Sequence, residues 1–126
     1  MIVGVLQFEL LIHDASSLKD KRRVVRSLRD RLHRDHLVAF AEVGALDKLN
    51  LALCAVSAVG ADAARIGAVL DRITTKLRAL TDAELAAATR ELITIPAMGT
   101  TALEESDIDA INAEMIARAA DGGLSP

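Results

Sequence analysis

Residues 16–34 read SSLKDKRRVVRSLRDRLHR, and the spacing of their apolar side chains predicts a single amphipathic helix. The predicted buried stripe consists of residues three or four positions apart: Leu18, Lys21, Val25, Leu28 and Leu32. Lys21 lies at the edge of this stripe, where its methylene stem covers apolar surface while its charge is expected to reach water. Ser17 and Asp20 resemble a capping box at the start of the helix.

The same helix concentrates the positive charge of the chain. Residues 17–36 contain eight Lys or Arg and three Asp, a balance of +5, whereas the rest of the chain has a balance of −8 and the whole chain −3. This segregation predicts an anion-binding surface, with RNA phosphates as the favoured ligand. The alternatives are an ordinary solvated helix face and a surface for an acidic protein. The candidate nucleic-acid-binding residues are Lys19, Lys21, Arg22, Arg23, Arg26 and Arg29.

The composition predicts a folded domain that does not bind nucleic acid by base stacking. The chain has 126 residues, 52% of them hydrophobic, which suits one domain with its own core. Its single cysteine, Cys54, excludes an intramolecular disulfide and is expected to be a buried, inert thiol. The only aromatic residues are Phe8 and Phe40, which we expect in the core. Nucleic acid would therefore be held through its phosphates and its shape.

The first twelve residues are apolar but lack a basic leader and contain Gln7 and Glu9, so they do not resemble a signal peptide. No apolar run is long enough to cross a membrane. We therefore expect a cytoplasmic protein.

Outside residues 17–36, the pattern predicts four strands and a second helix. The strands are expected at residues 2–13, 37–44, 49–59 and 86–95, with turn residues Gly44 and Asp47 between the second and third. Asp62 can cap a helix whose buried stripe is Ile66, Val69, Leu70, Ile73, Leu77 and Leu80. The order is thus βαββαβ, and right-handed crossovers place both helices on one face of a four-stranded antiparallel sheet. The predicted fold class is α+β, a ferredoxin-like sandwich with the first and third strands at its centre.

The two faces of the predicted sheet differ in polarity. In the first strand, the even-numbered residues from Ile2 to Ile12 are apolar and should meet the helices, while the other face is mixed. The strand at 49–59 is apolar on both faces, which predicts a strand covered on both sides. We expect either a second copy of the chain, forming a homodimer, or the C-terminal tail to cover the open face.

Residues 96–126 form an acidic tail outside the predicted domain of residues 1–95. Within it, an apolar stripe predicts a short helix at 107–119, with Ser106 and Asp109 as its capping pair. This acidic helix could lie against the basic helix and compete with an anionic partner.

Two motifs resemble those of a known bacterial family. Residues 14–22, DASSLKDKR, resemble the Ala-x-Ser-Leu-Lys-(Glu/Asp)-Lys-Arg signature of the YlxP-like family of unknown function, and residues 41–47, AEVGALD, resemble its second signature. The resemblance covers residues 1 to about 95 and implies a ferredoxin-like fold. The genes of the YlxP-like family commonly lie beside those for translation initiation factor two and ribosome-binding factor A, so the resemblance implies a role near ribosome assembly or translation. It implies no catalytic residues; the site candidates it provides are Lys19, Lys21, Arg22, Glu42 and Asp47.

Three other groups of residues are candidates for enzymatic or metal sites. These are a metal pair at His33 and His36, a general base at His13 beside Asp14, and a carboxylate pair formed by Glu9 and Glu42; in each, a structural role is the better interpretation. The sequence has no P-loop, nucleophile elbow or zinc spacing. We therefore expect no enzyme, cofactor or metal site. A protein-interaction module and, by analogy of fold, a small-molecule-binding regulatory domain are the alternatives to an RNA-binding protein.

Overall fold

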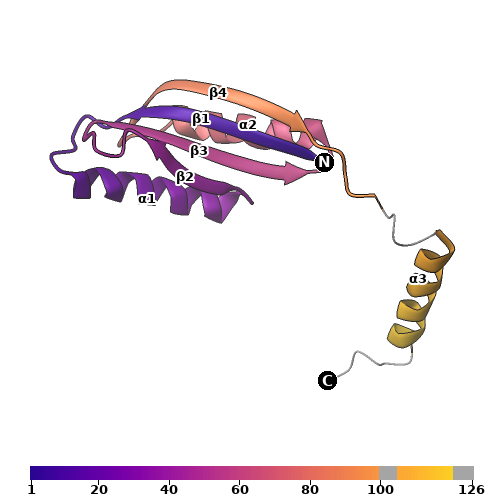
Figure 1. Cartoon of the computed structure of the whole chain (residues 1–126). Helices are drawn as coiled ribbons and strands as arrows, with labels where there is room; N and C mark the ends of the chain where they lie inside the picture. Colours follow the sequence, from indigo (N-terminus) through magenta and orange to yellow (C-terminus); the bar gives the residue numbers. More distant parts are fainter. Residues whose placement is uncertain (100–104, 121–126) are drawn as a thin grey trace. The chain divides into compact units, whose positions relative to one another are not determined.

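The computed structural model describes residues 1–99 and 107–120 in full, and the backbone of residues 105 and 106. The chain divides into two compact units, Met1–Pro96 and Ala97–Pro126, close to the predicted boundary. The first unit contains, in order, β1 (Ile2–Leu11), α1 (Leu18–Asp35), β2 (Ala39–Gly44), β3 (Leu51–Gly60), α2 (Ala63–Arg78) and β4 (Glu84–Thr94) (Figure 1). Each element lies where the sequence predicted one, with ends that differ by a few residues.

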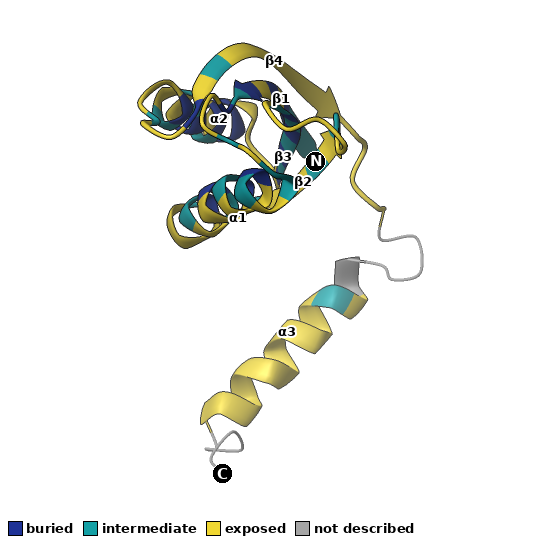
Figure 2. Ribbon diagram, turned by 90° about the vertical axis from the view of Figure 1, so that its left-hand side faces the viewer, coloured by how far each residue is buried: buried dark blue, intermediate teal, exposed yellow. Residues whose placement is uncertain are grey.

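The four strands form one antiparallel sheet in the order β2-β3-β1-β4, with α1 and α2 on the same face (Figure 2). The central strands are therefore β1 and β3, as predicted. In their register Phe8 lies opposite Cys54, so the inward-facing residues of both strands meet in one layer. The predicted α+β, ferredoxin-like fold is confirmed.

The core lies between the sheet and the two helices. Both Phe rings belong to it, with centroids 6.3 Å apart, and Phe8 is fully buried. The helical stripes supply the other half of the core: Val25, Leu28 and Leu32 from α1, and Ile66, Leu70, Ile73 and Leu77 from α2. The predicted helix periodicity therefore identified the residues that hold α1 and α2 to the sheet.

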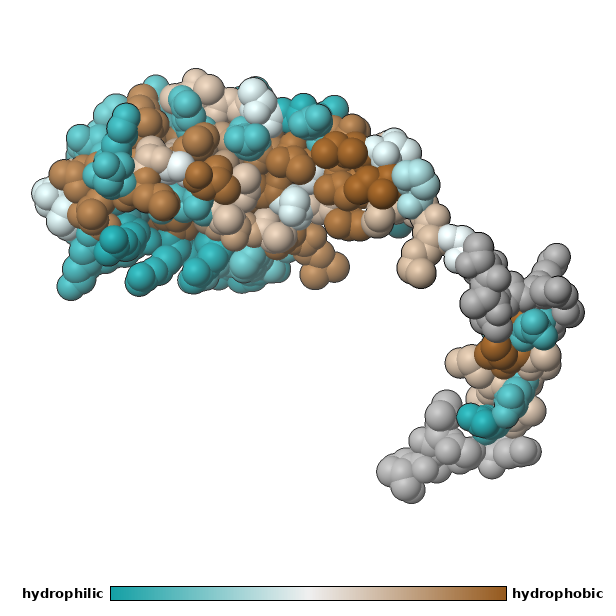
Figure 3. Space-filling view, viewed as in Figure 1, coloured by the Kyte–Doolittle hydropathy of each residue, from teal (hydrophilic) through white to brown (hydrophobic). Residues whose placement is uncertain are grey.

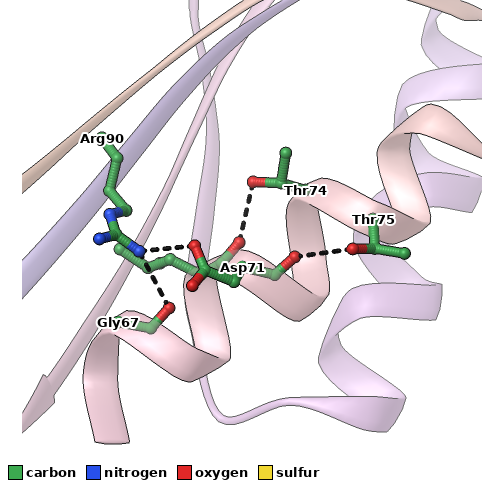
Figure 4. Close-up of polar contacts among 6 residues, drawn as sticks. Gly67, Asp71, Thr74, Thr75 and Arg90 are labelled. Carbon is green, nitrogen blue, oxygen red and sulfur yellow. Dashed lines mark hydrogen bonds and ion pairs between the residues drawn. The ribbon is translucent and has the colours of Figure 1, made fainter. Parts of the chain in front are cut away.

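The position of α2 against the sheet depends on close contacts. A Cβ added at Gly4 on β1 would lie 2.4 Å from Cγ2 of Ile66, so only glycine allows this approach. From β4, the Arg90 guanidinium donates to the Gly67 carbonyl and to the Asp71 carboxylate of α2 (Figure 4). Asp62 caps α2, as predicted, by accepting a hydrogen bond from the Ala64 amide at 2.9 Å.

The turn predicted between the second and third strands is confirmed, because the Ala45 carbonyl accepts a hydrogen bond from the Lys48 amide at 3.0 Å. Its left-handed residue is Ala45, with a φ of 55°, whereas Gly44, a predicted turn residue, is the last residue of β2. Within the first unit, β3 is covered by helices on one face only. Its second face is partly exposed, and Val59 keeps 64% of its surface accessible.

The second unit contains α3 (Glu105–Ala120), which begins two residues before the predicted helix and includes Ser106 rather than being capped by it. Its apolar residues Ile111, Met115 and Ile116 are exposed, and Arg118 pairs with Glu114 at 2.7 Å. Among the described residues, no helix combines the length and the apolar character needed to cross a membrane.

Candidate nucleic-acid interface

The start of α1 is determined by its serines. Ser17 has an extended backbone, and its hydroxyl accepts a hydrogen bond from the Asp20 amide at 3.1 Å, as an N-cap should. The Asp20 carboxylate accepts from the backbone and hydroxyl of Ser16, at 3.3 and 2.7 Å, rather than from the Ser17 backbone of a standard capping box. These hydrogen bonds from Ser16 lower the pKa of Asp20. The cap thereby fixes which residues of α1 face the sheet.

Lys21 is one of the residues that the cap turns inward. It is only 1% exposed, and its Nζ donates to the Ala45 carbonyl at 2.6 Å and lies 2.9 Å from Oε2 of Glu42. The expectation that its charge reaches water is therefore wrong. With both its stem and its ammonium group inside the domain, Lys21 offers nothing to a phosphate on the surface.

The partner of Lys21 is itself largely buried. Glu42 has a side chain that is 16% exposed, and it lies opposite Cys54 on β3. The 2.9 Å contact with Lys21 is an ion pair without hydrogen-bond alignment, and Glu42 Oε2 has no other hydrogen-bond donor in the described part of the chain. Burial, aided by the Glu42 charge, raises the pKa of Cys54 to about 12, so this thiol stays neutral and unreactive.

The two sequence motifs therefore meet in space. Lys21 belongs to the first motif, while Glu42 and Ala45 belong to the second, and their contacts join α1 to β2 and the turn that follows it. We name Lys21, Glu42 and Ala45 the buried junction. Asp47, the remaining candidate from the second motif, is exposed in the turn. Sequence reasoning named Lys21 and Glu42 as site candidates, whereas their contacts with each other and with Ala45 are internal; it did not name Ala45.

The other cations of α1 point away from the sheet. We name them the outer basic face: Lys19, Arg22, Arg23, Arg26, Arg31 and Arg34. Arg31 is half-buried and the others are exposed, and within residues 1–99 and 107–120 none of the six forms a salt bridge. Arg29 differs, because its Nε and Nη2 donate to Oδ1 of Asp30 at 3.1 and 3.0 Å. In Figure 3 hydrophilic side chains extend along the edge of the molecule where α1 lies.

Two hollows lie along this surface. The first, of about 520 Å³, is lined by Lys19, Arg23, Arg26, Ser27, Asp30, Arg31 and Arg34. The second, of about 360 Å³, lies between α1 and the edge strand β2, and Arg22, Arg26 and Arg29 form its basic side. Arg26 lines both. Sequence reasoning missed Arg31 and Arg34, although their helical spacing from Arg23, Arg26 and Ser27 places them on this side.

The guanidinium groups of the outer basic face present several N–H donors in a planar fork, the geometry that binds phosphate oxygens in pairs. Like charges three or four residues apart on a helix also repel each other, and a bound polyanion would relieve this repulsion. The chemistry that this face supports is therefore binding of phosphates, not proton transfer.

The residues of the other candidate sites either lie apart from each other or contact different partners. Glu9 is on the open face of the sheet and Glu42 on the helical face, so the two cannot form a carboxylate site, and that alternative is wrong. His13 contacts Glu84, with Nε2 and Oε2 2.9 Å apart, rather than Asp14. His36 contacts Lys76, while His33 is exposed. Among the described residues, no three His, Cys, Asp or Glu side chains gather as metal ligands.

A family model described as "Protein of unknown function (DUF503)" matches residues 3–90, which include all of α1 and both motifs. No curated protein matches the chain.

Proposed function

The chain belongs to the DUF503 family of proteins of unknown function, and since that membership brings no activity with it, we propose a function from the surface of the molecule. The protein binds RNA phosphates through the outer basic face and has no catalytic role. It acts in the cytoplasm, in ribosome assembly or translation, as the resemblance of its two motifs to the YlxP-like family suggests. The observation that carries this proposal is the row of six cations on α1, none of which forms a salt bridge within the described residues.

An RNA backbone suits this face better than a single small anion does. The helix has 18 residues, about 27 Å of axis, and basic side chains recur along it from Lys19 to Arg34. A polyanion can contact several of them at once, and each contact releases a counterion from the nucleic acid. Binding of this kind is strong at low salt and does not depend on base sequence.

The aromatic content restricts the kind of RNA. The sequence contains no Trp or Tyr, Phe8 is buried, and Phe40 packs against the core. Base stacking on exposed aromatic rings, the usual way to hold single strands, therefore has no platform here. The surface suits structured RNA, in which phosphates are displayed along a fixed backbone.

The decisive experiment compares two double variants with equal loss of charge. Arg23→Gln/Arg26→Gln removes two cations from the outer basic face, and Lys48→Gln/Arg78→Gln removes two exposed cations elsewhere. With a structured ribosomal RNA fragment, the first should bind more weakly and reduce the slope of log K against log salt by roughly 0.7–0.9 for each lost phosphate contact. The control should retain the parent slope. Equal binding by the Arg23/Arg26 variant and the parent would refute the proposal.

The ribosomal part of the proposal needs a separate measurement. Sedimentation of a cell extract at low and high salt shows whether the protein migrates with a ribosomal subunit. We expect co-migration at low salt that is lost at high salt, because the contacts are with phosphates. If the protein stays at the top of the gradient at both salt concentrations, it does not associate with ribosomes and the ribosomal part of the proposal is refuted. RNA binding itself is judged by the charge variants.

A second candidate function is a homodimer formed through the open face of the sheet. This face presents apolar side chains that are at least partly exposed, among them Val5, Leu53 and Val59. Uncovered apolar area of this kind is typical of an association surface. Analytical ultracentrifugation of the parent and of Leu53→Glu would test it: we expect a dimer that the carboxylate disrupts. A parent that sediments as a monomer at high concentration would exclude this candidate.

A further inference from the structure

A third hollow, separate from the two beside α1, lies at the opposite end of the helical layer from the buried junction. It has a volume of about 460 Å³ and is enclosed by the end of α1, the end of β3 and the first half of α2. It shares no residue with the outer basic face. Its volume is within the usual range for cavities that bind small molecules. We name it the inter-helix cavity.

One wall of the inter-helix cavity is apolar. Ile66 is buried, while Leu37 is 99% exposed. Val69 completes this wall from α2. Apolar side chains gathered around a concave surface favour a ligand with a hydrocarbon part, because binding removes that surface from water.

The acidic residues of the cavity are already engaged. Asp35 accepts a hydrogen bond from Nζ of Lys76 at 2.9 Å, and Asp62 accepts one from the Ala64 amide at the start of α2. The hydrogen bond from Lys76 lowers the pKa of Asp35. Asp35 is thus paired with Lys76, and Asp62 is engaged at the start of α2, where it keeps its negative charge.

The cations of the cavity are Arg65 and Arg72. They are seven residues apart with Val69 between them, so all three lie on one side of α2 and line the same cavity. Both arginines are exposed, and neither forms a salt bridge within the described parts of the chain. The cavity thus combines an aliphatic surface with two guanidinium groups that form no salt bridge within the described residues.

We propose that the inter-helix cavity binds a small aliphatic carboxylate. Its carboxylate accepts hydrogen bonds from Arg65 and Arg72, and its hydrocarbon chain packs on Leu37, Ile66 and Val69. A guanidinium group matches the two oxygens of a carboxylate, and the apolar wall discriminates against inorganic anions. This site makes the protein responsive to a metabolite and is independent of the RNA surface on α1.

The first test is a titration of the full chain followed by amide chemical shifts, with 4-methylpentanoate as the probe. We expect shifts centred on Gly60, Ala61 and Val69, with a dissociation constant on the order of 1 mM for so small a ligand. Acetate lacks the hydrocarbon part and 4-methylpentanamide lacks the charge, so each should bind at least about ten-fold more weakly. Equal binding of the amide, or shifts centred elsewhere, would overturn the proposal.

The second test uses variants of exposed residues, which should not disturb folding. Arg65→Gln/Arg72→Gln should lose at least about ten-fold in affinity for 4-methylpentanoate, whereas the matched Lys48→Gln/Arg78→Gln variant should bind as the parent does. Leu37→Ser should weaken the binding of 4-methylpentanoate but leave that of acetate unchanged. Unchanged affinity in the Arg65/Arg72 variant, with its thermal unfolding equal to that of the parent, would assign any binding to another site.

Discussion

Lys21 and Arg22 are neighbours in the same basic run, yet they belong to different regions of the molecule. Lys21 is 1% exposed and ends on Glu42 and the Ala45 carbonyl, whereas Arg22 is exposed and lines a hollow beside β2. Successive side chains on a helix point in directions about 100° apart, so one can lie in the core while the next lies in solvent. Residue type therefore says little about the role of a cation until its place on the helix is known.

The two regions also differ in what their charges do for stability. Moving a cation and a carboxylate out of water is costly, and their attraction and hydrogen bonds only offset that cost, so the buried junction depends on both partners being present. Exposed cations contribute little to folding, because water and salt screen them. We therefore expect substitutions in the buried junction to change stability, and those on the outer basic face to change binding.

The largest expected effect is that of Lys21→Met. Methionine retains most of the apolar stem but leaves Glu42 as a largely buried carboxylate without its cation, and the Ala45 carbonyl without its donor. We expect the free energy of unfolding to fall by about 3 kcal/mol, measured by urea denaturation near neutral pH. RNA affinity should be unchanged at temperatures where the variant is folded, because Lys21 is not on the surface.

Two further variants sharpen this comparison. Arg22→Met changes the adjacent cation in the same way and should alter stability by less than about 0.5 kcal/mol while weakening RNA binding. Lys21→Met/Glu42→Leu removes both charges and should recover most of the stability lost in the single variant. Loss of stability in Arg22→Met as large as in Lys21→Met would contradict the distinction between the two regions.

A smaller effect is expected for Ser17→Ala, because Ser17 is the N-cap that fixes where α1 begins. Loss of this hydrogen bond to the Asp20 amide should lower the free energy of unfolding by about 1 kcal/mol, again measured in urea. Ser16→Ala removes only the exposed contact with the Asp20 carboxylate and should cost less. If Ser16→Ala proved the more destabilising of the two, the assignment of the cap would be wrong.

The fold could be predicted because its signals are local and repeated. Apolar residues at helical spacing identified α1 and α2, and the alternating pattern of β1 identified the face that meets them. The order of elements then allowed few topologies, since crossovers are right-handed. Strand ends were less accurate: β1 stops at Leu11, and β2 begins at Ala39.

The site was harder to predict, because its key contacts join residues far apart in the chain. Lys21 fits the apolar stripe by position. No local pattern shows that its ammonium group contacts Glu42 and the Ala45 carbonyl, which lie 21 and 24 residues further along the chain. The left-handed backbone of Ala45 has no local signal either, since Gly44 beside it is the residue that usually adopts it. Likewise, the inter-helix cavity arises only when α1, β3 and α2 meet.

Ala45→Gly should stabilise the protein slightly. With a φ of 55°, Ala45 is in the left-handed region, where a Cβ costs about 1 kcal/mol, while glycine loses about 0.5 kcal/mol more chain entropy on folding. We expect a net gain of roughly 0.5 kcal/mol in the free energy of unfolding, from urea denaturation. Ala45→Val, whose branched side chain fits this conformation poorly, should destabilise the protein, and a gain with valine would show that the turn is unstrained.

The smallest expected effect concerns pH. It arises at the contact between His36, at the end of α1, and Lys76 of α2, which is more exposed than the buried junction. Burial and the neighbouring Lys76 ammonium lower the pKa of His36 from its usual 6.5, with Arg72 acting in the same sense and Asp35 opposing them. Because Lys76 can only donate, the 2.9 Å contact with Nε2 requires a neutral ring. A depressed pKa means that the folded state resists protonation. The stability that His36 provides is therefore complete above pH 6.5 and is lost as the pH falls through the folded-state pKa.

Urea midpoints between about pH 7.5 and about pH 5.5 should therefore fall for the parent and stay flatter for His36→Gln, which has no group that titrates in this range. The carboxylates of Asp20 and Asp35 do not interfere, because their lowered pKa values lie below 3.8 and act only in stronger acid. A parent and a His36→Gln variant with equal slopes would show that this contact, unlike the buried junction, does not contribute to the stability of the fold.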